Sequence, residues 1–167
     1  MDWSVACQAL LVVTFVVAAG GKLRPAGFRE FRLSLSRGLP VPETLAGPLA
    51  VTVVGAEVTV AAAVAVPVTA RWGFGLAALL LAAFTGAIVV MRRRGSTEPC
   101  RCFGATSAPP GRAAVVRNVL LLATALLGLA GAPADQPGPV VVLAVAAGAV
   151  AALLLINLDE IAHLITA

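Results

Sequence analysis

Apolar residues occupy five long blocks of the chain, and shorter polar connections separate them. A helix that spans a bilayer needs about 20 predominantly apolar residues, and each block reaches or approaches that length. We therefore predict an all-α integral membrane protein, a helical bundle with four core transmembrane helices and a fifth, accessory span, built as a single domain over residues 1–167. The predicted spans are residues 3–19, 43–68, 73–91, 113–130 and 140–158.

The first polar connection, residues 20–42, has an amphipathic pattern of its own. Apolar residues such as Phe28 and Phe31 alternate with Arg29 and Arg32 between two prolines. A helix of this kind can lie in the headgroup layer, with apolar side chains directed inward and arginines at the lipid phosphates. The pattern predicts a short interfacial helix between the first two spans.

Composition supports a membrane location. Hydrophobic residues make up 60% of the chain and charged residues 12%, whereas soluble domains carry about 25% charged residues. Small residues are abundant, and they allow close approach of helices where lipid already solvates apolar surface. We predict that Gly55, Gly73, Gly75 and Gly86 mark helix contacts.

The formal net charge of +4 comes almost entirely from arginines in two connections. One group lies in residues 22–37 and the other in residues 92–112, while the connections between them carry little positive charge. Basic connections face the cytoplasm, so we predict a plasma (inner) membrane protein with the N-terminus outside and the C-terminus in the cytoplasm. No soluble basic surface is left for nucleic acid.

The strongest candidate for chemistry is Cys100-Arg101-Cys102, in the connection before the fourth span. A disulfide across one residue closes a small, strained ring, and strained disulfides are typical of labile or catalytic sites. Arg101 favours the thiolate form, which is the reactive one. We predict Cys100 and Cys102 as catalytic thiols with Arg101 as their activator.

Two other readings of the cysteine pair stay open. Two thiolates suit a soft metal ion, but a zinc site needs two further ligands. Only Cys7 and His163 could supply them, and Cys7 belongs near the opposite face, so we predict no metal site. Alternatively, the thiols are unreactive loop residues. A cytoplasmic position is also unusual for a disulfide, which leaves three options: a cytoplasmic thiol partner, a loop drawn into the bilayer, or the reverse orientation.

Glu57 lies well inside the second predicted span. An acidic residue at that depth indicates either a function or a buried partner. The available partners are Lys22, Arg117 and Asn118, all near the same side of the membrane. We favour a structural polar cluster of these four residues over proton or ligand handling by Glu57.

The residues described above resemble the MauE branch of the DoxX-like membrane proteins. The resemblance is most specific at Pro99-Cys100-Arg101-Cys102-Phe103-Gly104; the other carriers are Gly21-Lys22-Leu23, Phe28, Leu39-Pro40, Glu57 and Arg117-Asn118. It implies a membrane protein of methylamine utilisation. The implied role is to help mature the small subunit of methylamine dehydrogenase, by supporting disulfide formation.

These observations lead to the prediction of a multi-pass membrane thiol-redox or maturation factor. As an enzyme it would be a thiol–disulfide oxidoreductase, in which Cys100 and Cys102 cycle between dithiol and disulfide. The expected partners are membrane lipid and a thiol-containing protein. Quinone is a conceivable electron acceptor, although the sequence carries no signature of a quinone site or of an oligomeric state. The alternatives are a small-solute or soft-metal transporter and a non-catalytic scaffold for a partner enzyme.

Overall fold

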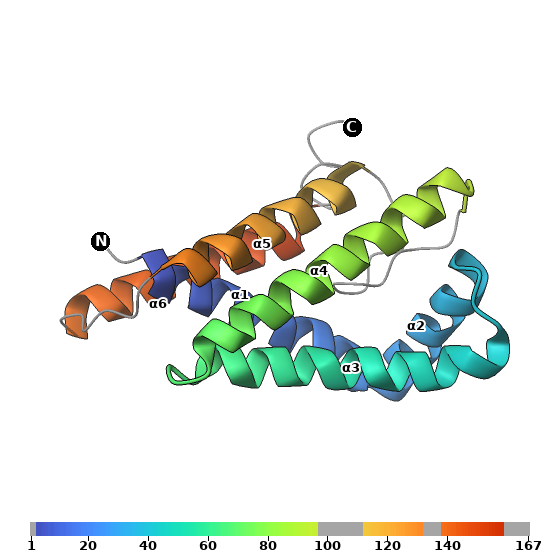
Figure 1. The fold of residues 1–167 in the computed structure, drawn as a ribbon, viewed down its shortest axis with the longest axis horizontal. Coiled ribbons are helices and arrows are strands. Elements are labelled where there is room, and N and C mark those ends of the chain that lie inside the picture. The colour runs from blue at the N-terminus through green and yellow to red at the C-terminus, as the bar shows by residue number, and fades with distance from the viewer. Residues whose placement is uncertain (1–2, 97–111, 132–137, 159–167) are drawn as a thin grey trace.

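The computed structural model describes residues 3–96, 112–131 and 138–158 of the protein. Within these ranges the chain forms α-helices and no strand, which confirms the predicted all-α class (Figure 1). The helices are α1 (Trp3–Leu23), α2 (Pro25–Gly38), α3 (Glu43–Ala65), α4 (Ala70–Arg93), α5 (Arg112–Ala130) and α6 (Gly138–Ile156).

Four of these helices are long and apolar enough to cross a membrane. They are α1, α3, α4 and α5, with 21, 23, 24 and 19 residues. At 1.5 Å per residue even the shortest is about 29 Å long, close to the hydrocarbon thickness of a bilayer. The prediction of a membrane helical bundle with four core spans is confirmed.

The ends of two spans differ from the prediction. The first helix does not stop at Ala19 but continues to Leu23, so Lys22 belongs to a helix rather than to a loop. The second predicted span reached residue 68, but α3 ends at Ala65. Val66 precedes Pro67 and is extended, with φ −93° and ψ 120°, because a following proline disfavours the helical conformation.

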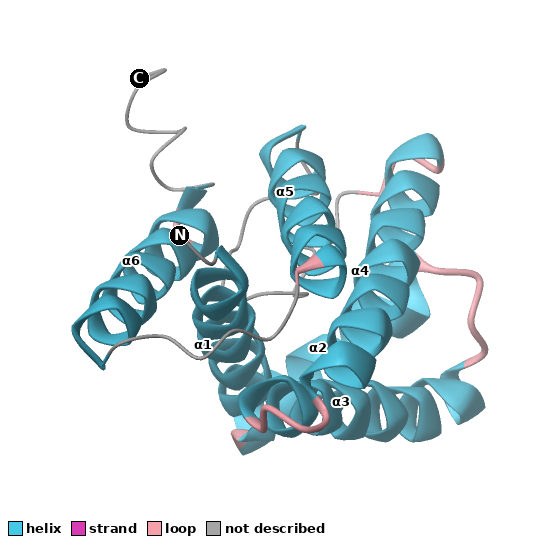
Figure 2. Ribbon diagram, turned by 60° about the vertical axis from the view of Figure 1, so that its left-hand side comes forward, coloured by secondary structure: helices cyan, strands magenta, loops and turns pink. Residues whose placement is uncertain are grey.

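The last helix, α6, packs along α1. Figure 2 shows the two helices side by side at one edge of the bundle. Gly148 makes this approach close, because a Cβ atom there would collide with the carbonyl oxygen of Ala6 and lie 2.9 Å from the Cβ of Ala9. The described apolar part of α6, Val141–Ile156, is shorter than the four core spans. Its role as a fifth, accessory span stays a prediction.

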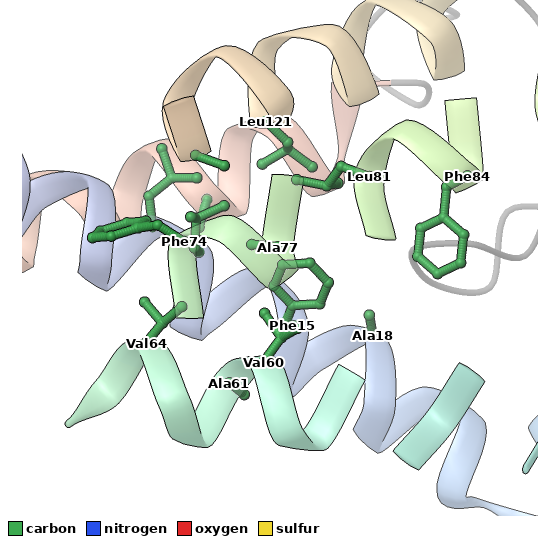
Figure 3. Packing of buried hydrophobic residues seen from close by; sticks show 14 of the residues in the cluster. Phe15, Ala18, Val60, Ala61, Val64, Phe74, Ala77, Leu81, Phe84 and Leu121 are labelled. Carbon is green, nitrogen blue, oxygen red and sulfur yellow. The ribbon is translucent and has the colours of Figure 1, made fainter. Parts of the chain in front are cut away.

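The core of the bundle is a single cluster of buried apolar side chains drawn chiefly from α1, α3, α4 and α5. Phe15, Val64, Leu81 and Leu121 are fully buried within it (Figure 3). Small residues such as Ala77, also fully buried, separate these larger side chains. This alternation lets the helices approach closely, as expected for packing within a membrane.

One of the four glycines predicted to mark helix contacts does so. A Cβ atom at Gly73 would lie 2.6 Å from the backbone nitrogen of Val64, so this glycine lets α4 start directly against the end of α3. The prediction is wrong for Gly55, Gly75 and Gly86, where a Cβ atom would meet nothing within 4 Å. Gly55 and Gly86 lie on outward faces of their helices.

Helix α2 is the predicted amphipathic helix, and it packs on protein rather than lying free in the headgroup layer. It contacts α1 and α3, and its buried residues Phe31, Ser34 and Gly38 share one helical face. The exposed face carries Arg29, Arg32 and Arg37. Figure 1 shows α2 beside the first half of α3, at the end of the bundle where α4 finishes.

Candidate functional site

The buried polar centre of the described structure is an ion pair between α1 and α3. Lys22 lies in the last turn of α1, and Glu57 lies in the second half of α3. Lys22 Nζ donates a hydrogen bond to Glu57 Oε1 over 2.6 Å, and the two side chains are 4% and 0% exposed. Two charges removed from water in this way stabilise each other, but either one alone would be strongly unfavourable. The pair therefore ties the end of α1 to α3.

Two aromatic rings complete the surroundings of the Lys22 ammonium group. Its Nζ lies 5.0 Å from the ring centroid of Phe31 and 5.9 Å from that of Phe84. Rings at these distances attract a cation, and the attraction is strongest where water is excluded. Phe31 belongs to α2 and Phe84 to α4. Side chains from α2, α3 and α4 thus converge on this lysine of α1.

A second buried polar group enters from α5. Arg117 and Asn118 are 1% and 0% exposed, on a helix that packs against α4 and α1. The amide oxygen and nitrogen of Asn118 make no hydrogen bond to any described residue, and the same holds for Oε2 of Glu57. Buried polar atoms without partners are uncommon in native proteins. They mark this interior as a place where a polar group or a water molecule could still bind.

The predicted polar cluster is brought together in part. All four of its members, Lys22, Glu57, Arg117 and Asn118, are buried. Lys22 is the residue that the structure places in contact with Glu57. Asn118 makes no hydrogen bond with the carboxylate. The earlier end predicted for α1 left Lys22 in a loop, whereas the helix carries it inward to Glu57.

The predicted catalytic residues Cys100, Arg101 and Cys102 lie outside the described residues, as does His163. The residues on either side of the cysteine segment are described. It leaves α4 after the exposed arginines 92–94 and resumes at Arg112, the exposed first residue of α5. The remaining cysteine, Cys7, lies on α1 and is a buried free thiol in the apolar core of the bundle. In the described ranges no group of three His, Cys, Asp or Glu residues could hold a metal ion.

Sequence reasoning missed the roles of Phe31 and Phe84. Phe31 was expected to face lipid from the interfacial helix, but it is 4% exposed and packs over Lys22. A signal was present, because the apolar residues Phe28, Phe31 and Leu35 recur at helical spacing and mark one face of α2. Nothing in the sequence around Phe84 distinguishes it from other apolar residues of its span.

The sequence matches a known protein family over most of its length. The family model described as "Methylamine utilisation protein MauE" matches residues 2–131. The matched region contains α1 to α5, including the ion pair and the cysteine segment, and it ends before α6. No curated protein and no solved structure matches the chain.

Proposed function

The chain belongs to the MauE family of membrane proteins, and on that premise we propose that it is a multi-pass membrane thiol-redox factor that supports disulfide formation in a partner protein. The observation that carries the proposal is Cys100-Arg101-Cys102. Two thiols one residue apart, between two membrane-spanning helices, suit reversible oxidation better than they suit packing.

The electrostatic setting of the cysteine segment supports this chemistry. Arg101 separates the thiols, Arg92–Arg94 precede the segment, and Arg112 follows it. Positive charge near a thiol favours the thiolate, which is the form that attacks a disulfide. The positive charge needs no additional soluble domain. The membrane-spanning helices supply it, at the C-terminal end of α4 and at the start of α5.

The proposed reaction is thiol–disulfide exchange. A thiolate of the partner attacks one sulfur of the Cys100–Cys102 disulfide, which breaks the S–S bond and forms a mixed disulfide. The second partner thiolate then displaces that sulfur, so the partner gains a disulfide and Cys100 and Cys102 become thiols. Two electrons and two protons have moved from the partner to this chain. A membrane quinone belongs to the class of acceptor that could remove them again.

The family description suggests a physiological context. MauE is described as a methylamine utilisation protein, and the resemblance in sequence implies the small subunit of methylamine dehydrogenase as the client. We include that client in the proposal as the first one to test. We also propose a plasma membrane location with the N-terminus outside, on the strength of the arginine distribution.

We assign Lys22, Glu57, Arg117 and Asn118 an architectural role. The contact of Lys22 with Glu57 joins two spans at a point where α2 and α4 also meet. A transporter would need a polar path, and a cavity that lies next to this ion pair is lined almost entirely by apolar side chains. This cavity therefore gives no support to a transporter function. The other alternative, a non-catalytic scaffold for a partner enzyme, is distinguished by the experiment below.

The test is co-expression of the small subunit of methylamine dehydrogenase with the wild-type chain and with Cys100→Ser and Cys102→Ser variants. Disulfides in the client are mapped by mass spectrometry. Each variant should leave the client largely reduced while the chain still inserts in the membrane. Cys7→Ser is the matched control, because Cys7 is buried in the core, and it should leave client oxidation unchanged. Normal client disulfides in both single variants would favour the scaffold and overturn the proposal.

A further inference from the structure

A cavity of about 190 Å³ lies between α2, α3 and α4. Its lining includes Phe31 and Leu35 of α2, Val53 of α3, and Leu80, Phe84 and Met91 of α4. Ser34 contributes the one hydroxyl group among its lining residues. An apolar cavity of this size excludes water and accepts hydrocarbon. Its natural occupant is therefore an apolar group rather than a polar solute.

The cavity is accessible from the surface of the bundle. Leu35, Val53 and Leu80 are half-buried, and Ala83, which also lines it, is exposed. Because α3 and α4 cross the membrane, this opening faces lipid. Along α4 the cavity extends from Leu80 to Met91, a rise of about 16 Å. It is thus an elongated space that a chain could enter from the side.

One end of the cavity is rimmed by positive charge. Met91 packs against Gly38, whose Cβ position would lie 3.2 Å from the Met91 sulfur. Arg37 adjoins Gly38, Arg92–Arg94 adjoin Met91, and all four side chains are exposed. In residues 25–43 and 91–96 there are six arginines and two glutamates. A phosphate group at this rim would meet net positive charge.

We propose that this cavity holds one acyl chain of an anionic phospholipid whose phosphate lies at Arg37 and Arg92–Arg94. The apolar lining selects a hydrocarbon chain, and the arginine rim selects a negative headgroup. Within the cavity the acyl chain meets Phe31 and Phe84, whose rings also lie over the Lys22 ammonium group. Bound lipid would therefore reinforce the packing of α2 on α4 around the buried ion pair.

The test uses the full chain in phosphatidylcholine vesicles that contain a small fixed fraction of a photoactivatable lipid with a diazirine on its acyl chain. One set carries phosphatidylglycerol with this acyl chain, and a matched set carries phosphatidylcholine with the same chain. Cross-linked residues are mapped by mass spectrometry. The phosphatidylglycerol probe should label cavity residues of α2 and α4 several-fold more than the phosphatidylcholine probe.

Two kinds of variant separate the acyl chain from the headgroup. Ala87→Phe places a ring in the cavity, which Ala87 lines, and Ala82→Phe places the same ring on the same helix outside the lining residues. Labelling of the cavity should fall several-fold in Ala87→Phe and persist in Ala82→Phe. Ala83→Leu fills part of the same space with a smaller change, should Ala87→Phe fail to fold.

Replacement of Arg92, Arg93 and Arg94 by Gln should reduce labelling by phosphatidylglycerol roughly fivefold for each arginine that contacts the phosphate. Arg71→Gln, at the other end of the same helix, should have no effect on it. Equal labelling by the two lipids would overturn the proposal, because it would indicate an uncharged occupant such as a quinone or any acyl chain. Labelling that survives both cavity-filling variants would overturn it as well.

Discussion

The two ends of the helical bundle are built on different principles. At the end where α3 turns into α4, side chains satisfy the last carbonyl groups of α3: Gln8 donates to Val64 over 2.5 Å, and Thr69 donates to Ala63 over 2.9 Å. Gly73 brings α4 directly onto this turn. Helix carbonyl groups without hydrogen-bond partners are unfavourable in lipid. At this end of the bundle, side-chain hydrogen bonds and close helix packing remove that cost.

At the opposite end, α2 packs on α3, and its Gly38 contacts Met91 near the end of α4. The result is a buried lysine held by a carboxylate and two rings, an apolar cavity, and a rim of arginines. The cysteine segment is joined to this end of α4. One end of the bundle is thus fixed by close contacts between helices, while the other holds the buried ion pair, the apolar cavity and the exposed arginines.

The largest expected effect comes from breaking the ion pair at the α2 end of the bundle. Glu57→Gln leaves the Lys22 ammonium group buried without its counter-ion and should lower the free energy of unfolding by about 3–5 kcal/mol. Unfolding of the purified protein in a mild detergent, followed by circular dichroism, measures this. Glu43→Gln is the control, because Glu43 is exposed at the start of α3, and it should change stability by less than about 1 kcal/mol.

A double variant distinguishes an architectural ion pair from a functional one. Lys22→Met combined with Glu57→Met removes both charges and should recover much of the lost stability, since apolar replacements of a buried pair are often neutral or better. If client oxidation is then normal, the pair is architectural, as proposed. Loss of client oxidation in a stable double variant would contradict that assignment.

A smaller effect is expected at the closed end of the bundle. Gly73→Ala places a Cβ atom 2.6 Å from the backbone nitrogen of Val64, and such overpacking should destabilise by about 1–3 kcal/mol. Gly75→Ala is the matched control two residues later, where nothing lies within 4 Å. It should be neutral or stabilising by about 0.5–1 kcal/mol. Equal destabilisation by both substitutions would show that this end is not closely packed.

The smallest effect concerns the side-chain bond to the end of α3. Gln8→Leu removes the donor to the Val64 carbonyl and should lower the free energy of unfolding by about 1 kcal/mol. Thr59→Val is the comparison, because the Thr59 hydroxyl donates to Gly55 within the same helix on an exposed face. It should change stability by less than about 0.5 kcal/mol. A larger loss of unfolding free energy in Thr59→Val than in Gln8→Leu would show that the Gln8 hydrogen bond does not stabilise the turn between α3 and α4.

The spans were predictable because their apolar blocks reflect contact with lipid, which depends on composition alone. Which face of a span meets protein was not predictable, since lipid and helix neighbours are both apolar. Gly55 and Gly86 illustrate this, because they lie on exposed faces of their helices, whereas Gly73 packs within the bundle.

The two residues of the ion pair were predictable from the sequence, but the geometry of the site was not. A buried Glu57 called for a partner, and Lys22 was among those named. The position of Lys22 depends on the last turn of α1, which continues beyond the apolar block. This turn brings Lys22 to the carboxylate of Glu57, 35 residues later in the chain. The rings of Phe31 and Phe84 around Lys22 follow from the same convergence of helices. No local pattern encodes a contact of that kind.

The most direct test of the central claim is differential alkylation of intact cells with membrane-permeant and impermeant maleimides, before and after reduction. We expect Cys100 and Cys102 to be found in part as a disulfide, so that some of their labelling appears only after reduction. Cys7 is the internal control, because its buried thiol should react only after denaturation. Cysteines 100 and 102 that are fully reduced under all growth conditions, with no labelling gained after reduction, would contradict the thiol-redox function.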